Sequence, residues 1–381
     1  MNLFLNFLLS IGLFTILVIL GILFKRKKER PKQLLAIIFT LLLFVILYSY
    51  GELNDIKIIQ SITFVVADAI GFLLGPLLYF YIQSIYKKER SNTVKSLLHF
   101  LPALVYIFII SVPFLISFLK DEYLFPYLKF IDSNEYLLQI QVLFLLLYLL
   151  FSFKALKQFK VLAKANYSNL TDKDISWVHH LLYGVLVVIL INISIELYAV
   201  FWKGQLSINN ILTTVALIIM VIYLGYFGIS QSQILLPTQT ISNKKSNTNA
   251  FAKAPTHHLA NADKIEIETL KNGLLQVLEN EQPYLDENLS LKTLAEMIPT
   301  TDRKLSALLN YHFDCSFYDF INTYRVKEIQ ARLGKDEFKK YTILALAFDS
   351  GFNSKSSFNR IFKKETGFSP SAYKKQLQDK K

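Results

Sequence analysis

Apolar residues crowd the first 236 positions of this 381-residue chain, in runs long enough to cross a lipid bilayer. A membrane-spanning helix needs roughly 20 mostly apolar residues, because all its backbone hydrogen bonds must be made within the segment. Seven runs have about this length: Leu3–Phe24, Gln33–Tyr50, Ile58–Ile85, Val94–Leu119, Tyr136–Phe153, Val178–Trp202 and Ile208–Ile229. The sequence therefore predicts a seven-helix transmembrane bundle over residues 1–236.

The composition changes along the chain in step with these runs. Hydrophobic residues make up 53% of the sequence and concentrate before residue 237, whereas the last third is charged and mixed. The first run lacks the basic start and the small-residue cleavage site of a signal peptide, so we expect it to be retained. This pattern predicts a membrane domain joined to a soluble C-terminal domain.

Clusters of basic residues between the runs predict the orientation in the membrane. They lie in every second loop, at Lys25–Arg30, at Lys87–Arg90 and among the lysines of 154–164. The alternate loops, over 51–57, 120–135 and 203–207, contain few lysines. Because cytoplasmic loops are enriched in Lys and Arg, we expect a multi-pass protein of the cytoplasmic (inner) membrane with its N-terminus outside. Seven crossings then leave the C-terminal domain in the cytoplasm, where DNA is found.

Three polar residues interrupt the apolar runs. Asp68 lies in the third run, and Asn192 and Glu196 lie in the sixth. Charged groups inside a membrane are costly and usually face a cavity or a partner. Two interpretations stay open: an intramembrane pocket open to the outside and formed by Asp68, Asn192 and Glu196, or a protonated or hydrogen-bonded pair with a structural role only.

The stretch 237–263 is predicted to be a flexible cytoplasmic linker. It is rich in Thr, Asn, Ser, Lys and Ala, contains two prolines and has no apolar periodicity. Regular spacing returns in the predicted domain 264–381, where four apolar residues between Ile267 and Leu278 indicate a helix that ends before Pro283. This helix either packs on the domain that follows, relays a signal, or pairs with a second copy.

Two helix-turn-helix units are predicted in the soluble part, at about 289–310 and 342–365. The first has its turn at Pro299–Thr301 and the second at Ser350–Gly351, each between two apolar stripes of helical spacing. Phe317–Leu333 has the pattern of a long helix that connects them. The predicted fold is therefore all-α: a seven-helix transmembrane bundle followed by a double helix-turn-helix domain.

A set of residues in the soluble part stands at spacings that one bacterial family shares. They are Leu294–Ala295, Leu305–Ser306, Phe320–Val326, Ile343–Ala347, Gly351–Phe352, Ser357–Arg360, Phe362–Lys364, Gly367, Ser369–Pro370 and Tyr373. Through them the segment from about 289 to 375 resembles the AraC/XylS family of transcription regulators. Through Gly75–Tyr79 and His99–Pro102, the apolar part is similar to the multi-spanning N-terminal regions of some members in Bacteroidetes-type bacteria.

The resemblance implies that two recognition helices enter successive major-groove segments on one face of double-stranded DNA. The implied contact residues are Thr301, Arg303, Lys304 and Ser306 in the first, and Asn353, Ser354, Lys355, Ser356, Asn359, Arg360, Lys363 and Lys364 in the second. Arginine can bind guanine bidentately, and asparagine can bind adenine in the same way. Ala307 stands where the family often has a larger polar residue, so we expect the first helix to read fewer bases.

Several of these residues have a second interpretation. Ser354 is equally well placed to cap its helix, and Arg360 to pack between helices. Lys363 and Lys364 suit the phosphate backbone better than base edges. From Thr300 onward sixteen Lys and Arg face nine Asp and Glu, and this excess of positive charge favours phosphate contact and salt-dependent binding.

The sequence contains no pattern that indicates an enzyme. It has no P-loop, zinc hydrolase motif or nucleophile elbow. Cys315 is the single cysteine, which excludes an intramolecular disulfide and a cysteine-rich metal site. We therefore expect no catalytic residue, no cofactor and no metal.

The sequence favours a membrane-bound, sequence-specific DNA-binding transcription regulator. Its partners would be double-stranded DNA, the lipid bilayer and an unidentified small-molecule or lipid signal sensed by the bundle. An alternative from another class is a membrane receptor or carrier whose C-terminal domain binds a protein. A third interpretation is that the bundle only anchors the domain. Whether the chain forms a homodimer, and whether it activates or represses, stays open.

Overall fold

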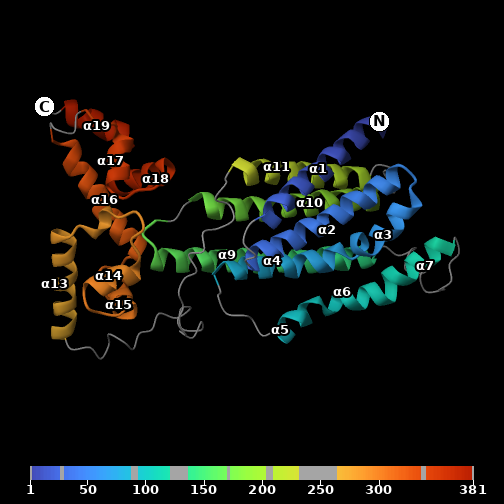
Figure 1. Ribbon diagram of the computed structural model, residues 1–381, viewed down its shortest axis with the longest axis horizontal. Coiled ribbons are helices and arrows are strands. Elements are labelled where there is room, and N and C mark those ends of the chain that lie inside the picture. The colour runs from blue at the N-terminus through green and yellow to red at the C-terminus, as the bar shows by residue number, and fades with distance from the viewer. Residues whose placement is uncertain are drawn as a thin grey trace. The chain divides into compact units, whose positions relative to one another are not determined.

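The structure is a computed structural model that describes residues 2–25, 30–86, 93–120, 136–169, 172–202, 209–230, 264–335 and 340–379. The described residues fall into helices, with one isolated bridge between Tyr167 and Ser290. They divide into two units (Figure 1). The first comprises Met1–Lys157 and Lys173–Thr240, and the second Gln158–Asp172 and Ile241–Lys381. The predicted linker 237–263 and most of the predicted basic loops lie outside the described residues.

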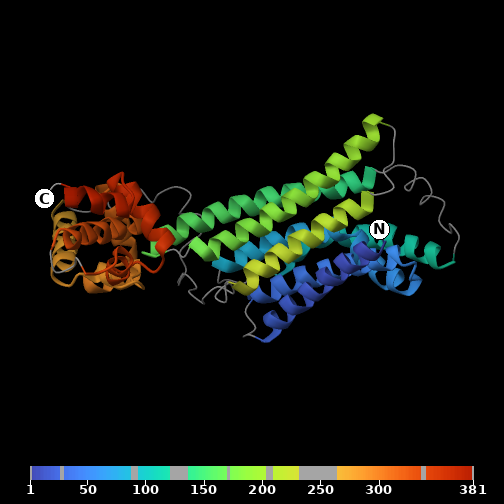
Figure 2. The same cartoon turned by 90° about the horizontal axis from the view of Figure 1, so that it is seen from above.

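The first unit is built from long apolar helices. They are α1 (Asn2–Lys25), α2 (Arg30–Leu53), α3 (Lys57–Asp68), α4 (Ile70–Tyr86), α5 (Thr93–Leu97), α6 (Leu101–Tyr106), the π-helical turn η2 (Ile107–Ser111), α7 (Val112–Lys120), α9 (Tyr136–Asn166), α10 (Asp172–Trp202) and α11 (Asn209–Ser230). Helix α1 packs beside α2 and α11, as Figures 1 and 2 both show.

Five helices of this unit are individually long and apolar enough to cross a membrane, among the residues described. The count becomes six if α3 and α4, which meet at a 56° bend, form one broken span. The seventh predicted run corresponds to α11, in which the apolar stretch Leu212–Gly225 is too short to count as a candidate span. The described residues of the seven runs are largely helical, but the structure gives five or six candidate spans where the sequence predicted seven.

The first unit exposes many large apolar side chains. Phe4, Phe14 and Phe108 are each more than 60% exposed, whereas Ile38 and Phe39 are buried. A large exposed apolar surface is rare on soluble proteins and normal where lipid is the solvent. This surface is compatible with membrane insertion.

Glycines let α4 and α9 approach closely. A Cβ atom at Gly71 would lie 2.8 Å from the Gln141 side chain, and one at Gly75 would lie 2.9 Å from Cβ of Tyr148. Small residues at four-residue spacing allow such packing between membrane helices. The small residues of the third apolar run therefore have a packing role.

The second unit contains the C-terminal helices and the end of α9. Its further helices are α13 (Lys264–Asn280), the 3-10 turn η3 (Pro283–Leu285), α14 (Leu291–Met297), α15 (Asp302–His312), α16 (Phe317–Leu333), α17 (Ile343–Asp349), α18 (Lys355–Thr366) and α19 (Pro370–Asp379). Five of them begin at a Ser or Thr whose hydroxyl accepts a hydrogen bond from the backbone N–H three residues on: Ser290, Thr301, Ser316, Thr342 and Ser354. Such caps satisfy otherwise unpaired N–H groups and fix where each helix starts.

Helix α16 is shared by two apolar cores. Phe317, Phe320 and Ile321 pack in a core with α13, α14 and α15. Val326 and Ile329, further along the same helix, pack in a core with α17 and α18. The predicted connecting helix Phe317–Leu333 is confirmed residue for residue, and it joins the two helix-turn-helix units.

Candidate nucleic-acid interface

Helix α18 is the second helix of the downstream unit and is fixed on one side by the core. Phe358, Ile361 and Phe362 are each at most 4% exposed. The Ser354 hydroxyl caps its start, and Gly367 ends it in the left-handed conformation with φ of 79°. Because these side chains follow helical spacing, the polar residues of α18 must face elsewhere.

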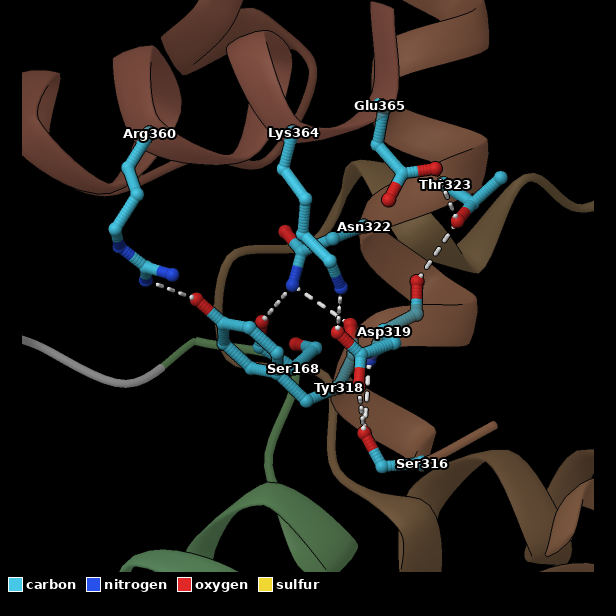
Figure 3. Close-up of polar contacts among 9 residues, drawn as sticks. All are labelled: Ser168, Ser316, Tyr318, Asp319, Asn322, Thr323, Arg360, Lys364 and Glu365. Carbon is cyan, nitrogen blue, oxygen red and sulfur yellow. Dashed lines mark hydrogen bonds and ion pairs between the residues drawn. The ribbon is translucent and has the colours of Figure 1, made fainter. Parts of the chain in front are cut away.

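One polar side of α18 is bound to α16 (Figure 3). Arg360 Nη2 donates to the hydroxyl of Tyr318 over 3.0 Å, and Lys364 Nζ donates to Asp319 Oδ1 over 2.9 Å. The Thr323 hydroxyl donates to Glu365 over 3.1 Å. Arg360 and Lys364, both implied DNA contacts, are thus engaged inside the domain.

The ion pair affects both partners electrostatically. Burial raises the pKa of Asp319, but hydrogen bonds from Ser316 and Lys364 and the positive charge of Lys364 outweigh it, so the net pKa is lowered. The hydrogen bond to Asp319 in turn raises the pKa of Lys364. Both groups are therefore charged at neutral pH, and the contact is an ion pair.

A different side of α18 is exposed. Lys355, Ser356, Asn359 and Lys363 lie on it, at spacings of one and four residues. Within the described part of the chain, the side chains of Lys355, Asn359 and Lys363 form no hydrogen bond or ion pair. This exposed face, defined by Lys355, Ser356, Asn359 and Lys363, offers cations and an amide, the groups that bind phosphates and base edges in a major groove.

The two remaining DNA-contact residues that the resemblance implies in the downstream helix-turn-helix unit have local roles. Ser354 is the N-cap of α18, and its hydroxyl accepts from the Ser357 N–H over 3.2 Å. Asn353 is partly buried, and its side-chain oxygen is enclosed without a hydrogen-bond partner in the described structure. Neither belongs to the exposed face of α18.

The upstream helix-turn-helix unit divides its polar residues in the same manner. Thr301 caps α15, and its hydroxyl accepts from the Lys304 N–H. The Lys304 ammonium pairs with Glu266 of α13 over 2.6 Å. Arg303 is exposed, whereas Ser306 is partly buried. Arg303 is therefore the cation that α15 presents most openly.

Two features of α15 differ from the expectation. Ala307 is 8% exposed and packs inward, so a larger residue there would meet the core rather than DNA. Asn310 is exposed and follows Arg303 and Ser306 at helical spacing, and its amide donates to the Ser306 carbonyl over 2.8 Å. Sequence reasoning missed Asn310, although its i, i+3, i+7 relation to Arg303 and Ser306 was a usable signal.

The predicted intramembrane residues are only partly brought together. Asp68 ends α3 at the bend before α4, and its carboxylate accepts from the Ser111 hydroxyl over 2.6 Å and from the Tyr106 hydroxyl over 3.2 Å. Its backbone carbonyl accepts from Gln141 over 3.0 Å. The sequence singled out none of these three partners.

The other two predicted pocket residues lie on α10. No hydrogen bond between described residues joins Asn192 to Asp68, and the side chain of Glu196 is outside the described part. Among the described residues, no group of three His, Cys, Asp or Glu side chains could hold a metal ion.

Comparisons with known proteins bear on the C-terminal part. Residues 294–376 match a family model described as a helix-turn-helix domain. A 99-residue stretch, 26% of this chain, is 30% identical to an uncharacterized HTH-type transcriptional regulator of Staphylococcus aureus (strain COL) and covers 13% of that protein. No solved structure matches the chain.

The matched residues coincide with the geometry described above. They begin in α14 and end in α19, and so include both helix pairs and the connecting helix α16. The match supports the two helix-turn-helix units predicted for this part of the chain. The C-terminal part of this chain carries a helix-turn-helix domain.

Proposed function

We propose that this protein is a membrane-bound, sequence-specific DNA-binding transcription regulator whose transmembrane bundle senses a ligand or a membrane state. The observation that carries the DNA-binding part is the exposed face of α18. The side chains of its two lysines and of Asn359 have no partner among the described residues, while the opposite side of the helix is fixed in a core. A helix held in this way can enter a major groove without rearranging.

The two helix-turn-helix units read DNA unequally. In the second, the exposed face of α18 supplies an amide for a base edge and cations for phosphates. In the first, Arg303 is the exposed cation, while Lys304 pairs with Glu266. We therefore assign most of the sequence discrimination to α18 and mainly positioning contacts to α15.

The membrane part of the proposal rests on its apolar exterior and on the surroundings of Asp68. The carboxylate lies where α3 breaks, against the π-helical turn η2. Such turns and breaks occur often at functional sites, and a charged group inside an apolar bundle is retained mainly for function. A stimulus shifts the bundle only if it binds one conformation better than another.

A selection from random duplex DNA tests the DNA-binding function. Full-length protein in lipid nanodiscs is incubated with the pool, and bound sequences are amplified and sequenced. We expect enrichment of a defined motif, and an affinity that falls linearly with the logarithm of salt concentration. A pool without enrichment even at low salt would contradict the proposal and favour a protein partner instead.

A bundle exchange separates sensing from anchoring. Residues 158–172 belong with the C-terminal helices, although they lie between the two stretches of the bundle, 1–157 and 173–236. The exchange therefore replaces these two stretches with an unrelated membrane anchor and keeps residues 158–172. If genome-wide DNA occupancy responds to growth conditions as before, the bundle is only an anchor. If occupancy becomes constant, the bundle senses.

A further inference from the structure

Arg325 of α16 is a fully buried cation among the C-terminal helices, with 0% of its surface exposed. Nε donates to the backbone carbonyl of Tyr284 and Nη2 to that of Asp286, each over 2.7 Å. Burial lowers the pKa of Arg325 to about 10, which still leaves it charged at neutral pH. A buried guanidinium needs a partner for each of its five N–H groups, and these two carbonyls satisfy only two.

The remaining partners come from a segment about 155 residues earlier in the chain. Nη1 donates to the Ser168 carbonyl over 3.2 Å and to the Asn169 side-chain oxygen over 3.1 Å. Nη2 donates to the Ser168 hydroxyl over 3.0 Å. Three of the five hydrogen bonds of this buried charge thus depend on residues that precede the helix-turn-helix domain.

The same two residues bridge both helix-turn-helix units. The Ser168 hydroxyl donates to the carbonyl of Leu289, just before α14. The Asn169 amide donates to the carbonyl of Glu287 over 2.6 Å and to that of Gly351, in the turn between α17 and α18, over 2.9 Å. The Asn169 side chain therefore joins the loop before the first helix-turn-helix unit to the turn of the second helix-turn-helix unit.

The contact continues along the end of α9. Ala163 is 3% exposed in the core of α17 and α18, where Phe159 and Tyr167 also pack. Lys164 lies over the Tyr318 ring with its Nζ 5.5 Å from the ring centroid. The Ser168 carbonyl also accepts from the Asn322 amide over 3.0 Å, as drawn in Figure 3.

We propose that Phe159–Asn169, called here the docking segment, is a built-in ligand of the helix-turn-helix domain that holds its two units in the arrangement DNA binding requires. Two recognition helices can occupy successive grooves together only at one separation and angle. A bridge that fixes this relation before DNA arrives reduces the ordering cost of binding. The effect on DNA rests on the proposed function, whereas the docking itself does not.

The docking segment also has a direct covalent relation to the apolar part. Helix α9 is one helix from Tyr136 to Asn166, and its residues 139–166 include a stretch apolar enough to cross a membrane. The segment is therefore attached to a candidate membrane span without a linker. A stimulus that displaces α9 would move Ser168 and Asn169, and through them it would act on both helix-turn-helix units. This route does not pass through residues 237–263.

The test compares two asparagines of the full-length chain in lipid nanodiscs. Asn169→Ala removes one acceptor of Arg325 and both bridging donors. The matched control, Asn166→Ala, lies three residues earlier, where the amide donates to the Leu162 carbonyl of its own helix and to no other described residue. Ser168→Ala is a milder second variant, because it keeps the backbone carbonyl and loses only the hydroxyl. Hydrogen exchange of α15 shows whether each variant is folded.

Two readouts separate docking from DNA binding. We expect Asn169→Ala to speed hydrogen exchange around 167–169 and 350–352, and to weaken binding to the selected DNA motif, each by about tenfold, the effect of losing hydrogen bonds to a charged group. Ser168→Ala should move both readouts in the same direction by a smaller factor, and Asn166→Ala should leave both unchanged.

Each other outcome overturns a defined part of the inference. Unchanged exchange in Asn169→Ala would show that the segment does not dock. Faster exchange with tighter DNA binding would show that docking opposes DNA binding, and faster exchange with unchanged affinity would show that it has no bearing on it. If the unaltered protein enriches no DNA, the proposed function fails, and the exchange arm alone still decides whether the segment docks.

Discussion

Lys364 and its neighbour Lys363 differ in what their side chains contact, although both belong to α18 and both are exposed. The Lys364 ammonium donates to Asp319 of α16 over 2.9 Å, whereas the Lys363 ammonium has no partner among the described residues. Successive residues of a helix point about 100° apart, which follows from 3.6 residues per turn. The sequence predicted the same phosphate contact for both lysines, whereas in the described structure only Lys364 of the two forms an ion pair.

This difference predicts unequal effects on salt dependence. Lys363→Ala should reduce the steepness of the logarithmic salt dependence of DNA binding by about one, because one phosphate contact is lost. Lys364→Ala should change it less, since its ammonium is already neutralised by Asp319. Affinities for the selected motif measured across salt concentrations compare the two variants. Equal slopes would place both lysines, or neither, at the phosphates.

Asn359 is predicted to read a base. It is the one amide on the exposed face of α18, and asparagine pairs bidentately with adenine. Asn359→Ala should relax discrimination at one base pair by about 1–3 kcal/mol, while overall binding persists through the phosphate contacts. Affinities for duplexes substituted one base pair at a time measure this. Asn288→Ala, an exposed asparagine in the loop before α14, is the control and should preserve the full motif.

Local signals made the helix-turn-helix domain predictable. A capping residue followed by apolar residues at helical spacing fixes a helix by contacts within a few residues, and α16 was found at its predicted ends for this reason. Ser316 caps its start, and Phe317, Phe320, Ile321 and Ile329 form its apolar stripe. The predicted turn at Pro299–Thr301 likewise ends at the start of α15, which Thr301 caps.

Contacts between distant segments were not predictable in this way. Ser168 and Asn169 carry no local sign that they complete the hydrogen bonds of Arg325, because spacing says nothing about a partner some 155 positions away. The inward packing of Ala307 depends on which side of α15 meets the core. The break at Asp68 splits a run that is long and mostly apolar, so hydropathy alone predicted one span there.

Asp319 is predicted to make the α16–α18 contact sensitive to acid. Its pKa is lowered in the folded protein, so its stabilising contribution is fully present above the unfolded value near 3.8 and is lost as pH falls through the lower folded value. The contact should therefore hold from neutral pH to about pH 4 and weaken below it.

Asp319→Asn checks this expectation. The variant should exchange amide hydrogens of α16 and α18 faster than the unaltered chain at neutral pH, and the difference should disappear in acid. Hydrogen exchange, corrected for the intrinsic effect of pH, is the suitable measurement because both tryptophans, Trp177 and Trp202, precede the C-terminal helices. A difference that persists below the folded pKa would mean that the carboxylate charge is not the cause.

Asp68 is predicted to be needed for the response of the bundle. Asp68→Asn, alone or with Glu196→Gln, should leave the amount of protein in the membrane unchanged and reduce the change in DNA occupancy between growth conditions by about fivefold or more, the lower end of usual coupling energies. Asp55→Asn is the control, since Asp55 is exposed in the turn before α3 and has φ of 53°, which asparagine tolerates. An undiminished response would leave Asp68 a structural role.

Gly351 and Gly367 are predicted to differ sharply in their tolerance of alanine. Both have positive φ, 87° and 79°, so each substitution carries a strain of about 1–2 kcal/mol. At Gly367 nothing lies within 4 Å of an added Cβ, but at Gly351 the Cβ would lie 2.5 Å from the Tyr284 carbonyl and 2.8 Å from Nε of Arg325. Backbone and a buried guanidinium cannot move away cheaply, which adds about 1–3 kcal/mol of overpacking.

Hydrogen exchange of α16 measures the difference between the two glycines. Gly351→Ala should lower the protection of these amides by about 100-fold, and Gly367→Ala by about tenfold. Because the Gly351 carbonyl also accepts from Asn169, only Gly351→Ala should in addition speed exchange at 167–169. Equal effects of the two alanines would mean that backbone strain alone governs Gly351, and that Arg325 is not held against this turn.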